Sequence, residues 1–215
     1  MNRISKLLNL LADPKSFHAL ISLRYNGYLL QRGWFTAYKT GTPVGGKNEP
    51  LPWMTYPFIS FIEQRLTREM DIFEYGSGYS TLYFAPKVRT IISVEHDIAW
   101  LEKMKADIPG NSTINYIELD VNGAYAQSSV NSGKQFDIII VDGRDRVNCM
   151  KQSVEALNRR GVLILDDAQR EEYRPGINYL GEKNFKRISF TGIAPGNLDE
   201  KNTDVFYRSD NCLNI

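Results

Sequence analysis

The sequence has few of the residues that build metal centres and disulfide frameworks. It contains 2 cysteines and 2 histidines among 215 residues. Cys149 and Cys212 lie far apart and form no Cys-x-x-Cys or Cys/His spacing, which argues against a zinc site or a disulfide scaffold. Such sparse use of cysteine fits a reducing compartment best, and we expect a cytoplasmic protein.

Long apolar runs and an excess of one charge are also missing. No uninterrupted apolar stretch approaches the roughly 20 residues of a membrane span. The N-terminal run MNRISKLLNLLADPK is interrupted by Asn9 and ends at Asp13 and Pro14, which makes it a poor signal peptide. The formal net charge is +1, so no global field would recruit nucleic acid. We therefore expect no integral membrane segment and no nucleic-acid partner.

Apolar residues are plentiful enough for a full core. With 42% hydrophobic and 12% aromatic residues, the length predicts one α/β domain, residues 51–215, that follows an N-terminal helical extension, residues 1–50. At the end of the extension, residues 40–52 read TGTPVGGKNEPLP. Prolines and glycines at this density predict a loop that could lie over a pocket.

Two helices are predicted within the extension. Asp13 followed by Pro14 is typical of an N-cap and a first helical residue. Amphipathic helices usually bury their apolar stripe in protein, so we expect packing on the main domain or on a second subunit, which gives a possible homo-oligomer. Docking on a membrane surface is the alternative. The two stripes are Ile4, Leu7, Leu8 and Leu11, and then Phe17, Leu20, Ile21 and Tyr28.

The stretch 71–85, DIFEYGSGYSTLYFA, predicts a buried strand, a glycine turn and a helix. Gly76 and Gly78 bracket a turn in which the backbone can take positive φ and approach a ligand closely. Ser80 or Thr81 can cap the following helix, whose N-terminus would direct free N–H groups at the turn. An ordinary loop would share these residues, since short glycine motifs recur by chance.

Four further apolar runs alternate with helical patterns, which predicts a mostly parallel sheet covered on both faces. They end in acids, and ligands of such sheets bind outside the carboxyl ends of the strands. Glu95 closes the second strand, about 20 residues beyond the glycines, where an acid accepts hydrogen bonds from ribose hydroxyls. His96 could contact the ligand or be structural. The runs are 90–95, 114–120, 136–141 and 162–165, and a helix through Val147, Met150, Val154 and Leu157 is expected to end at residues 159–161.

This pattern, from about residue 52 to residue 207, resembles the class I S-adenosylmethionine-dependent methyltransferases, in particular a bacterial group with a GSGxST first motif. The resemblance implies a Rossmann-like doubly wound sheet of order 3-2-1-4-5-7-6, whose last strand is antiparallel. Residues 185–190 and 203–208 are similar to the final strand pair of the family. One departure is Ser80, which stands where a third glycine is often found.

The resemblance also implies roles for individual residues. Asp120 would lie near the adenine, and Asp142 would lie near the methyl donor. The residues expected to bind S-adenosylmethionine are Glu74, Tyr75, Gly76, Ser77, Gly78, Ser80, Thr81, Glu95, His96, Asp120 and Asp142. The residues expected at the reacting centre are Asp142, Arg144, Asp166 and Asp167.

The acceptor could lose its proton in two ways, with a bound metal ion or to a general base without one. Asp142, Asp166 and Asp167 resemble the ligand set of the Mg-dependent catechol-type O-methyltransferases, but Asp167 stands where an amide is usual. Hard oxygen ligands would suit Mg. Alternatively, arginines at positions 144, 146 and 170 neutralise the acids, and Asp142 is a general base. We favour the base without a metal.

We expect a methyltransferase acting at oxygen on a small-molecule or glycan-like acceptor. An NAD-dependent Rossmann oxidoreductase is the rival, but a GxGxxG fingerprint starting at Gly76 would need glycine where Thr81 stands. We also expect no second substrate domain. A catalytically silent scaffold that binds the donor is the third alternative.

Overall fold

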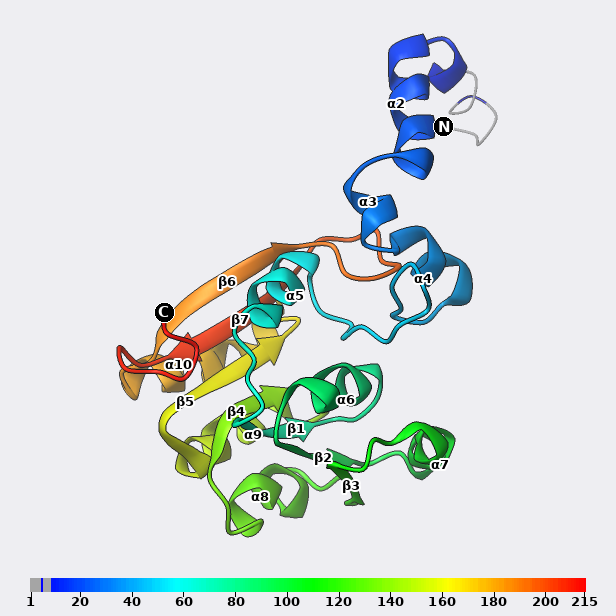
Figure 1. Cartoon of the computed structure of the whole chain (residues 1–215). Helices are drawn as coiled ribbons and strands as arrows, with labels where there is room; N and C mark the ends of the chain where they lie inside the picture. Colours follow the sequence, from blue (N-terminus) through cyan, green and yellow to red (C-terminus); the bar gives the residue numbers. More distant parts are fainter. Residues whose placement is uncertain (1–4, 6–8) are drawn as a thin grey trace.

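The computed structural model of the protein describes residue 5 and residues 9–215. Its core is a single seven-stranded sheet (Figure 1). The strands are β1 Asp71–Tyr75, β2 Thr90–Glu95, β3 Ser112–Tyr116, β4 Phe136–Val141, β5 Leu157–Asp166, β6 Lys186–Gly192 and β7 Lys201–Tyr207. The helices are α2 Pro14–Tyr25, α3 Tyr28–Gln31, α4 Trp34–Thr40, α5 Tyr56–Glu63, α6 Tyr79–Phe84, α7 Ile98–Met104, α8 Ala124–Asn131, α9 Arg146–Ser153 and α10 Arg174–Glu182.

The predicted sheet is confirmed. The strand order is β3-β2-β1-β4-β5-β7-β6, the first five strands pair in parallel, and β7 runs antiparallel to both β5 and β6. Adjacent residues of β4 face opposite sides: Ile138 packs with α5 and α6, whereas Ile139 packs with α8 and α9. The central strands read as continuous apolar runs because both of their faces are covered.

Two predicted boundaries are wrong. The helix expected to end at residues 159–161 ends at Ser153. Strand β5, expected to begin at Val162, already begins at Leu157, which pairs with Phe136. Gly161 is therefore part of the strand. A side chain on it would meet Leu157 and the carbonyl oxygen of Phe136 within 3 Å, so this glycine serves close packing beside an irregularity of the sheet.

The third strand also ends earlier than predicted, at Tyr116. Beyond it, the Ile117 N–H still donates to the carbonyl of Glu95 at 2.9 Å, and the carboxylate of Asp120 accepts hydrogen bonds from the backbone N–H groups of Ala124 and Tyr125 at the start of α8, at 3.0 and 3.2 Å. This acid therefore lies beyond the strand end. Helices α8 and α10 had no counterpart among the predicted elements.

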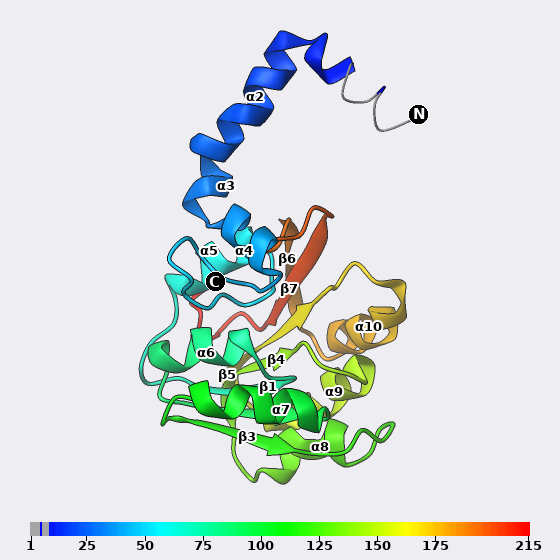
Figure 2. The same cartoon turned by 90° about the vertical axis from the view of Figure 1, so that its right-hand side faces the viewer.

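The N-terminal extension divides into two parts. Asp13 caps α2, as predicted, by accepting from the Ser16 N–H. Helix α2 points away from the sheet and none of its residues is buried (Figure 2). In contrast, Trp34 of α4 packs in the same core as α5, and its indole N–H donates to the carbonyl of Asn197 at 2.8 Å. The predicted stripe residues Ile4, Leu7 and Leu8 lie outside the described residues.

Within the described part of the chain, none of the helices has the length and apolar character that crossing a membrane requires.

Candidate active site

The glycine turn after β1 lies against the turn after β4. Gly76 has φ of +89°, and a Cβ on it would come within 3.1 Å of the Gly143 Cα. Gly78 has φ of +156°, and a Cβ there would lie 3.3 Å from the Trp100 ring of α7. Only glycine can take these positive φ values and also lie this close to its neighbours at low cost. The backbone therefore closes tightly at the point where strand order reverses, which is where ligands bind in such sheets.

Glu74 is a fully buried carboxylate beneath this turn. Its Oε2 accepts hydrogen bonds from the hydroxyls of Thr81, at 2.5 Å, and Ser93, at 2.8 Å. Its Oε1 has no partner within the described residues, although Glu74 lines the adjacent cavity. Burial raises the pKa of Glu74, and the neighbouring hydroxyls of Ser80, Thr81 and Ser93 oppose that effect. An unsatisfied buried carboxylate oxygen is costly, so this atom is suited to accept from a ligand.

Glu95 ends β2 beside the same turn. Its Oε2 accepts from the backbone N–H and the hydroxyl of Ser77, both at 3.1 Å. Its Oε1 accepts from the N–H groups of His96 and Asp97 at 2.8 and 2.9 Å. The Nδ1 of His96 lies 2.9 Å from Oε1, but without hydrogen-bond geometry. Glu95 thus holds the first and second strand ends together.

Two adjoining cavities open at this edge of the sheet. The first, of about 240 Å³, is lined by Glu74, Gly76, Ser77, Ser80, Glu95, His96, Asp142, Gly143, Arg144 and Arg146. The second, of about 220 Å³, is lined by Gly41, Thr42, Pro43, Trp53, Ser77, Gly78, Tyr79, Ser80, Trp100, Lys103 and Asp142. Both include Asp142, which therefore lies where they meet. The start of the proline- and glycine-rich loop walls the second cavity, as the sequence predicted.

The acids at the ends of β4 and β5 are paired with cations. Arg146 donates to Asp142 Oδ1 at 3.0 Å and lies 3.7 Å from Asp167 Oδ2, which also accepts from Arg170 at 2.7 Å. Lys201, from the start of β7, contacts Asp166 and lies 2.8 Å from Asp167 Oδ1. The remaining oxygen of Asp166 accepts from Thr203 at 2.8 Å.

Burial and mutual repulsion act against these cations. Burial raises the pKa of Asp142, whereas Arg146 and Lys201 oppose the rise. Burial, and next the charge of Asp142, raise the pKa of Asp166 to about 7. Burial also acts on Asp167, but Lys201 and the arginines outweigh it and lower the pKa of Asp167. Two carboxyls of the cluster, those of Asp142 and Asp166, therefore keep a proton up to a higher pH than an ordinary aspartate does.

Five of the predicted site residues line neither cavity: Tyr75, Thr81, Asp120, Asp166 and Asp167. The Tyr75 side chain points into the core under α8, where its hydroxyl donates to the carbonyl of Ala126 at 2.8 Å, so only its backbone faces the turn. Asp120 caps α8 and is not among the residues that line the two cavities. Arg144 is exposed at the rim of the first cavity, whereas Arg146 holds the acids.

Lys201, Trp53 and Trp100 were not singled out in the sequence. The Lys201 ammonium also donates to the carbonyl of Trp53 at 3.0 Å, and the Trp100 indole donates to the carbonyl of Ser77 at 2.7 Å. No local motif marks them. Lys201 reaches the cluster only because β7 pairs antiparallel with β5, so that Thr203 lies opposite Asp166.

The strand order, the antiparallel seventh strand and the glycine turn at the switch in strand order define the class I S-adenosylmethionine-dependent methyltransferase fold, as the resemblance implied. Neither a protein-family model nor a curated protein sequence matches the chain. Solved structures do match, at low sequence identity.

Three of these structures illustrate the likeness. A precorrin-8W decarboxylase of Methanobacterium thermoautotrophicum has a TM-score of 0.53 and 14% identity over 78% of this chain and 96% of that chain. A methyltransferase-like protein of Silicibacter pomeroyi has a TM-score of 0.52 and 22% identity, with coverage of 74% and 90%. A putative methyltransferase of Streptococcus mutans, in complex with S-adenosylhomocysteine, has a TM-score of 0.50 and 11% identity, with coverage of 69% and 94%. At these identities the likeness concerns the fold.

Proposed function

We propose that this protein is an S-adenosylmethionine-dependent methyltransferase that transfers a methyl group to an oxygen of a small-molecule or glycan-like acceptor. One observation carries the proposal: Glu74, Glu95 and Asp142, from three neighbouring strands, line one cavity over the glycine turn. The fold of the similar structures supports it. The acceptor class is an inference from the sequence.

The residues of the first cavity suit such a donor. The unpartnered Oε1 of Glu74 would accept a hydrogen bond from the ammonium group of an amino acid moiety. Glu95 would orient the ribose hydroxyls at the end of β2, and its existing bonds to Ser77 hold it in place. His96 and Ser80 complete the wall. Asp120, predicted near the adenine, would act from outside this wall.

The second cavity is proposed to receive the acceptor. When bound, the donor supplies a methyl group that its sulfonium already activates, so the protein must align the acceptor and exclude water. Trp53 and Trp100 provide apolar walls there. Asp142, at the junction of the cavities, would take the proton of an acceptor hydroxyl, and a pKa raised by burial suits a general base.

The acid cluster does not fit a divalent cation as its side chains lie. Both oxygens of Asp166 and both oxygens of Asp167 are already engaged by Lys201, Thr203, Arg146 and Arg170. A cation would have to displace the Lys201 ammonium. The proton of the acceptor is therefore proposed to pass to Asp142 without a metal.

Calorimetric titration of the purified chain with S-adenosylmethionine and, separately, with NAD tests the proposal. We expect saturable binding of S-adenosylmethionine and none of NAD. The reverse result would favour the oxidoreductase. Methyl transfer from the labelled donor to candidate hydroxyl acceptors would then separate an enzyme from a silent scaffold. A cytoplasmic location and the lack of a nucleic-acid partner belong to the same proposal.

A further inference from the structure

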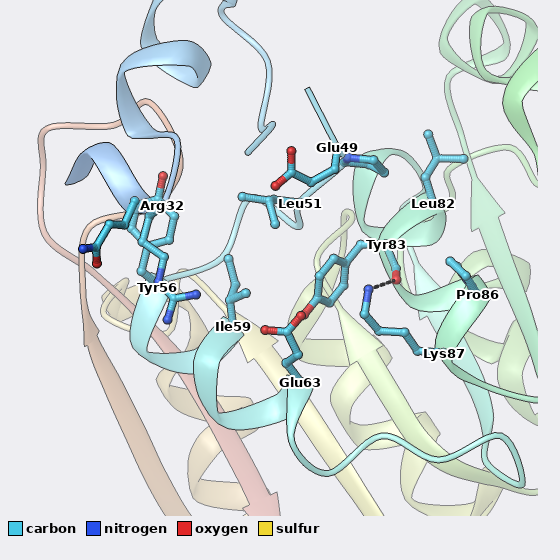
Figure 3. Close-up of a pocket in the computed structure, with 12 residues that line it drawn as sticks. Arg32, Glu49, Leu51, Tyr56, Ile59, Glu63, Leu82, Tyr83, Pro86 and Lys87 are labelled. Carbon is cyan, nitrogen blue, oxygen red and sulfur yellow. Dashed lines mark hydrogen bonds between the residues drawn. The ribbon is translucent and has the colours of Figure 1, made fainter. Parts of the chain in front are cut away.

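A third cavity, of about 420 Å³, lies away from the acid cluster, between α5 and α6 (Figure 3). Its walls come from the end of α3, residues 49–51 of the proline- and glycine-rich loop, α5, and the segment 82–87. Its volume is within the range of about 300 to 1,000 Å³ that small-molecule sites occupy. None of its residues lines either cavity of the proposed methyl-transfer site.

Two buried tyrosines that line this cavity have hydroxyls without a hydrogen-bond partner among the described residues. Tyr56 is 1% exposed and Tyr83 is 3% exposed, and both line the cavity. The Tyr83 ring projects between Ile59 and Lys87, with its hydroxyl directed towards Glu63 (Figure 3). Burial raises the pKa of both tyrosines, so the phenols stay neutral and can each donate and accept. Unsatisfied buried hydroxyls are disfavoured, and a partner is expected in the cavity.

The charges around these hydroxyls balance. Arg32 and Lys87 are the cations of the wall, and Glu49 and Glu63 are its anions. Arg32 contacts the Ser60 hydroxyl, and Lys87 donates to the carbonyl of Tyr83 at 2.9 Å and lies over that ring. A ligand with a net charge would be attracted by the two side chains of opposite charge and repelled by the two of like charge. The wall instead combines hydrogen-bond donors and acceptors of both charges with aromatic rings and Ile59.

We propose that this cavity binds one unit of an uncharged saccharide. Sugar hydroxyls donate and accept at once, so they can satisfy Tyr56 and Tyr83 while they donate to the glutamates and accept from Arg32. Apolar C–H faces of a sugar ring can lie against the tyrosine rings and Leu51. The same loop contributes residues 49–51 to this cavity and Gly41, Thr42 and Pro43 to the cavity proposed for the acceptor. Binding here requires no methyl donor and does not depend on the proposed activity.

Ligand-observed NMR on the full chain, without donor, tests this site with three probes of one scaffold: glucose, glucose 6-phosphate and glucosamine. We expect saturable binding of glucose, with weaker binding of the anionic and cationic probes. Tyr83→Phe and Tyr56→Phe each remove one hydroxyl without changing the ring, and each should weaken glucose binding about two- to tenfold. Tyr38→Phe, at an exposed tyrosine outside the cavity, should leave it unchanged.

Each other result would overturn the proposal. If water alone satisfies the two hydroxyls, glucose will not bind. Tighter binding of either charged probe than of glucose would show a different ligand class. Binding that survives both tyrosine substitutions would place the sugar elsewhere. Because the phenols have no partner among the described residues, their removal should not unfold the chain, and a thermal melt of each variant checks this.

Discussion

Glu74 and Glu95 lie on adjacent strands and face the same cavity, but they perform different work. Glu95 uses both oxygens to hold the glycine turn and the start of the next loop. Glu74 has one oxygen bound to hydroxyls and one without a partner in the described part of the chain. Three backbone N–H groups and the Ser77 hydroxyl already fill the four lone-pair sites of the Glu95 carboxylate. A ribose hydroxyl would therefore take the place of the Ser77 hydroxyl, the one of these donors that can rotate away.

Replacement of Glu95 by Ala should weaken donor binding by roughly 1 to 3 kcal/mol, the range of a charge-assisted hydrogen bond. The protein should still fold, because the groups that lose a partner belong to Ser77 and His96, which line the cavity, and to the exposed Asp97, where water can replace the carboxylate. Calorimetric titration with S-adenosylmethionine measures the change, and Glu118→Ala, at an exposed acid beyond β3, is the control. Unchanged affinity in the Glu95 variant would remove this residue from the site.

Asp142 would have different roles in the two mechanisms: a general base without a metal, or a ligand of a metal ion. As a general base it must be ionised, and burial raises its pKa. Turnover should therefore fall as pH is lowered, and the fall should begin at a pH above the ordinary aspartate pKa of about 3.9. Asp142→Asn should reduce kcat by about 10²- to 10⁴-fold while the donor still binds. EDTA should have no effect.

The control for this experiment is Asp137→Asn, at the opposite end of the same strand, for which turnover should be unchanged. An activity lost with EDTA and restored with Mg would overturn the metal-free base. Wild-type activity in Asp142→Asn would rule out both versions. The sequence could supply the three acids, because they follow apolar strands, but it could not supply Lys201, whose approach depends on the reversed direction of β7.

At the scale of elements, the glycine turn is shaped by its neighbours as much as by a ligand. Helix α7 presses Trp100 against Gly78 and donates to the carbonyl of Ser77. Glycine pattern and strand periodicity predicted the turn. The contact with Trp100 was not predictable, since it joins residues more than twenty positions apart on different elements.

Gly78→Val should abolish donor binding. The branched side chain would be strained at φ of +156° and would meet the Trp100 ring, which moves the turn away from Glu95. Gly110→Val, where a Cβ meets nothing within 4 Å, is the matched control. Titration with S-adenosylmethionine, together with circular dichroism, separates a local effect from unfolding. Normal affinity in a folded Gly78→Val protein would refute the role of the turn.

Helix α10 shows why other elements escaped prediction. Its sequence RPGINYLGE contains a proline and two glycines, which usually interrupt helices. Pro175 lies in the first turn of the helix, where proline is tolerated because its missing N–H would have no helical partner there. A side chain on Gly176 would meet the Met150 side chain at 2.1 Å. Close packing of α10 on α9 therefore requires glycine at position 176, although glycine disfavours a helix.

At the scale of the whole molecule, the extension contains both an anchored and an unanchored part. Trp34 is 6% exposed and is fixed by Asn197, whereas Leu20 and Ile21 of α2 are 52% and 44% exposed. The stripe of Phe17, Leu20, Ile21 and Tyr28 was predicted to pack on the main domain or on a second subunit. Tyr28, which lies in α3, meets the Tyr56 ring of α5 edge-on at 6.0 Å between centroids, whereas none of the stripe residues in α2 is buried. Self-association through residues 1–50 thus stays a prediction.

Substitutions at these two places should have opposite consequences. Trp34→Ala should lower the free energy of unfolding by about 3 to 5 kcal/mol, because it leaves a cavity in the core and an unpaired carbonyl at Asn197. Leu20→Ala should change the unfolding of a monomer by no more than about 0.5 kcal/mol. If α2 joins two copies, however, Leu20→Ala will lower the melting temperature in a concentration-dependent way, and light scattering will report a smaller mass than for the unchanged chain. A monomeric mass for both proteins, with equal melting temperatures, would contradict self-association through this helix.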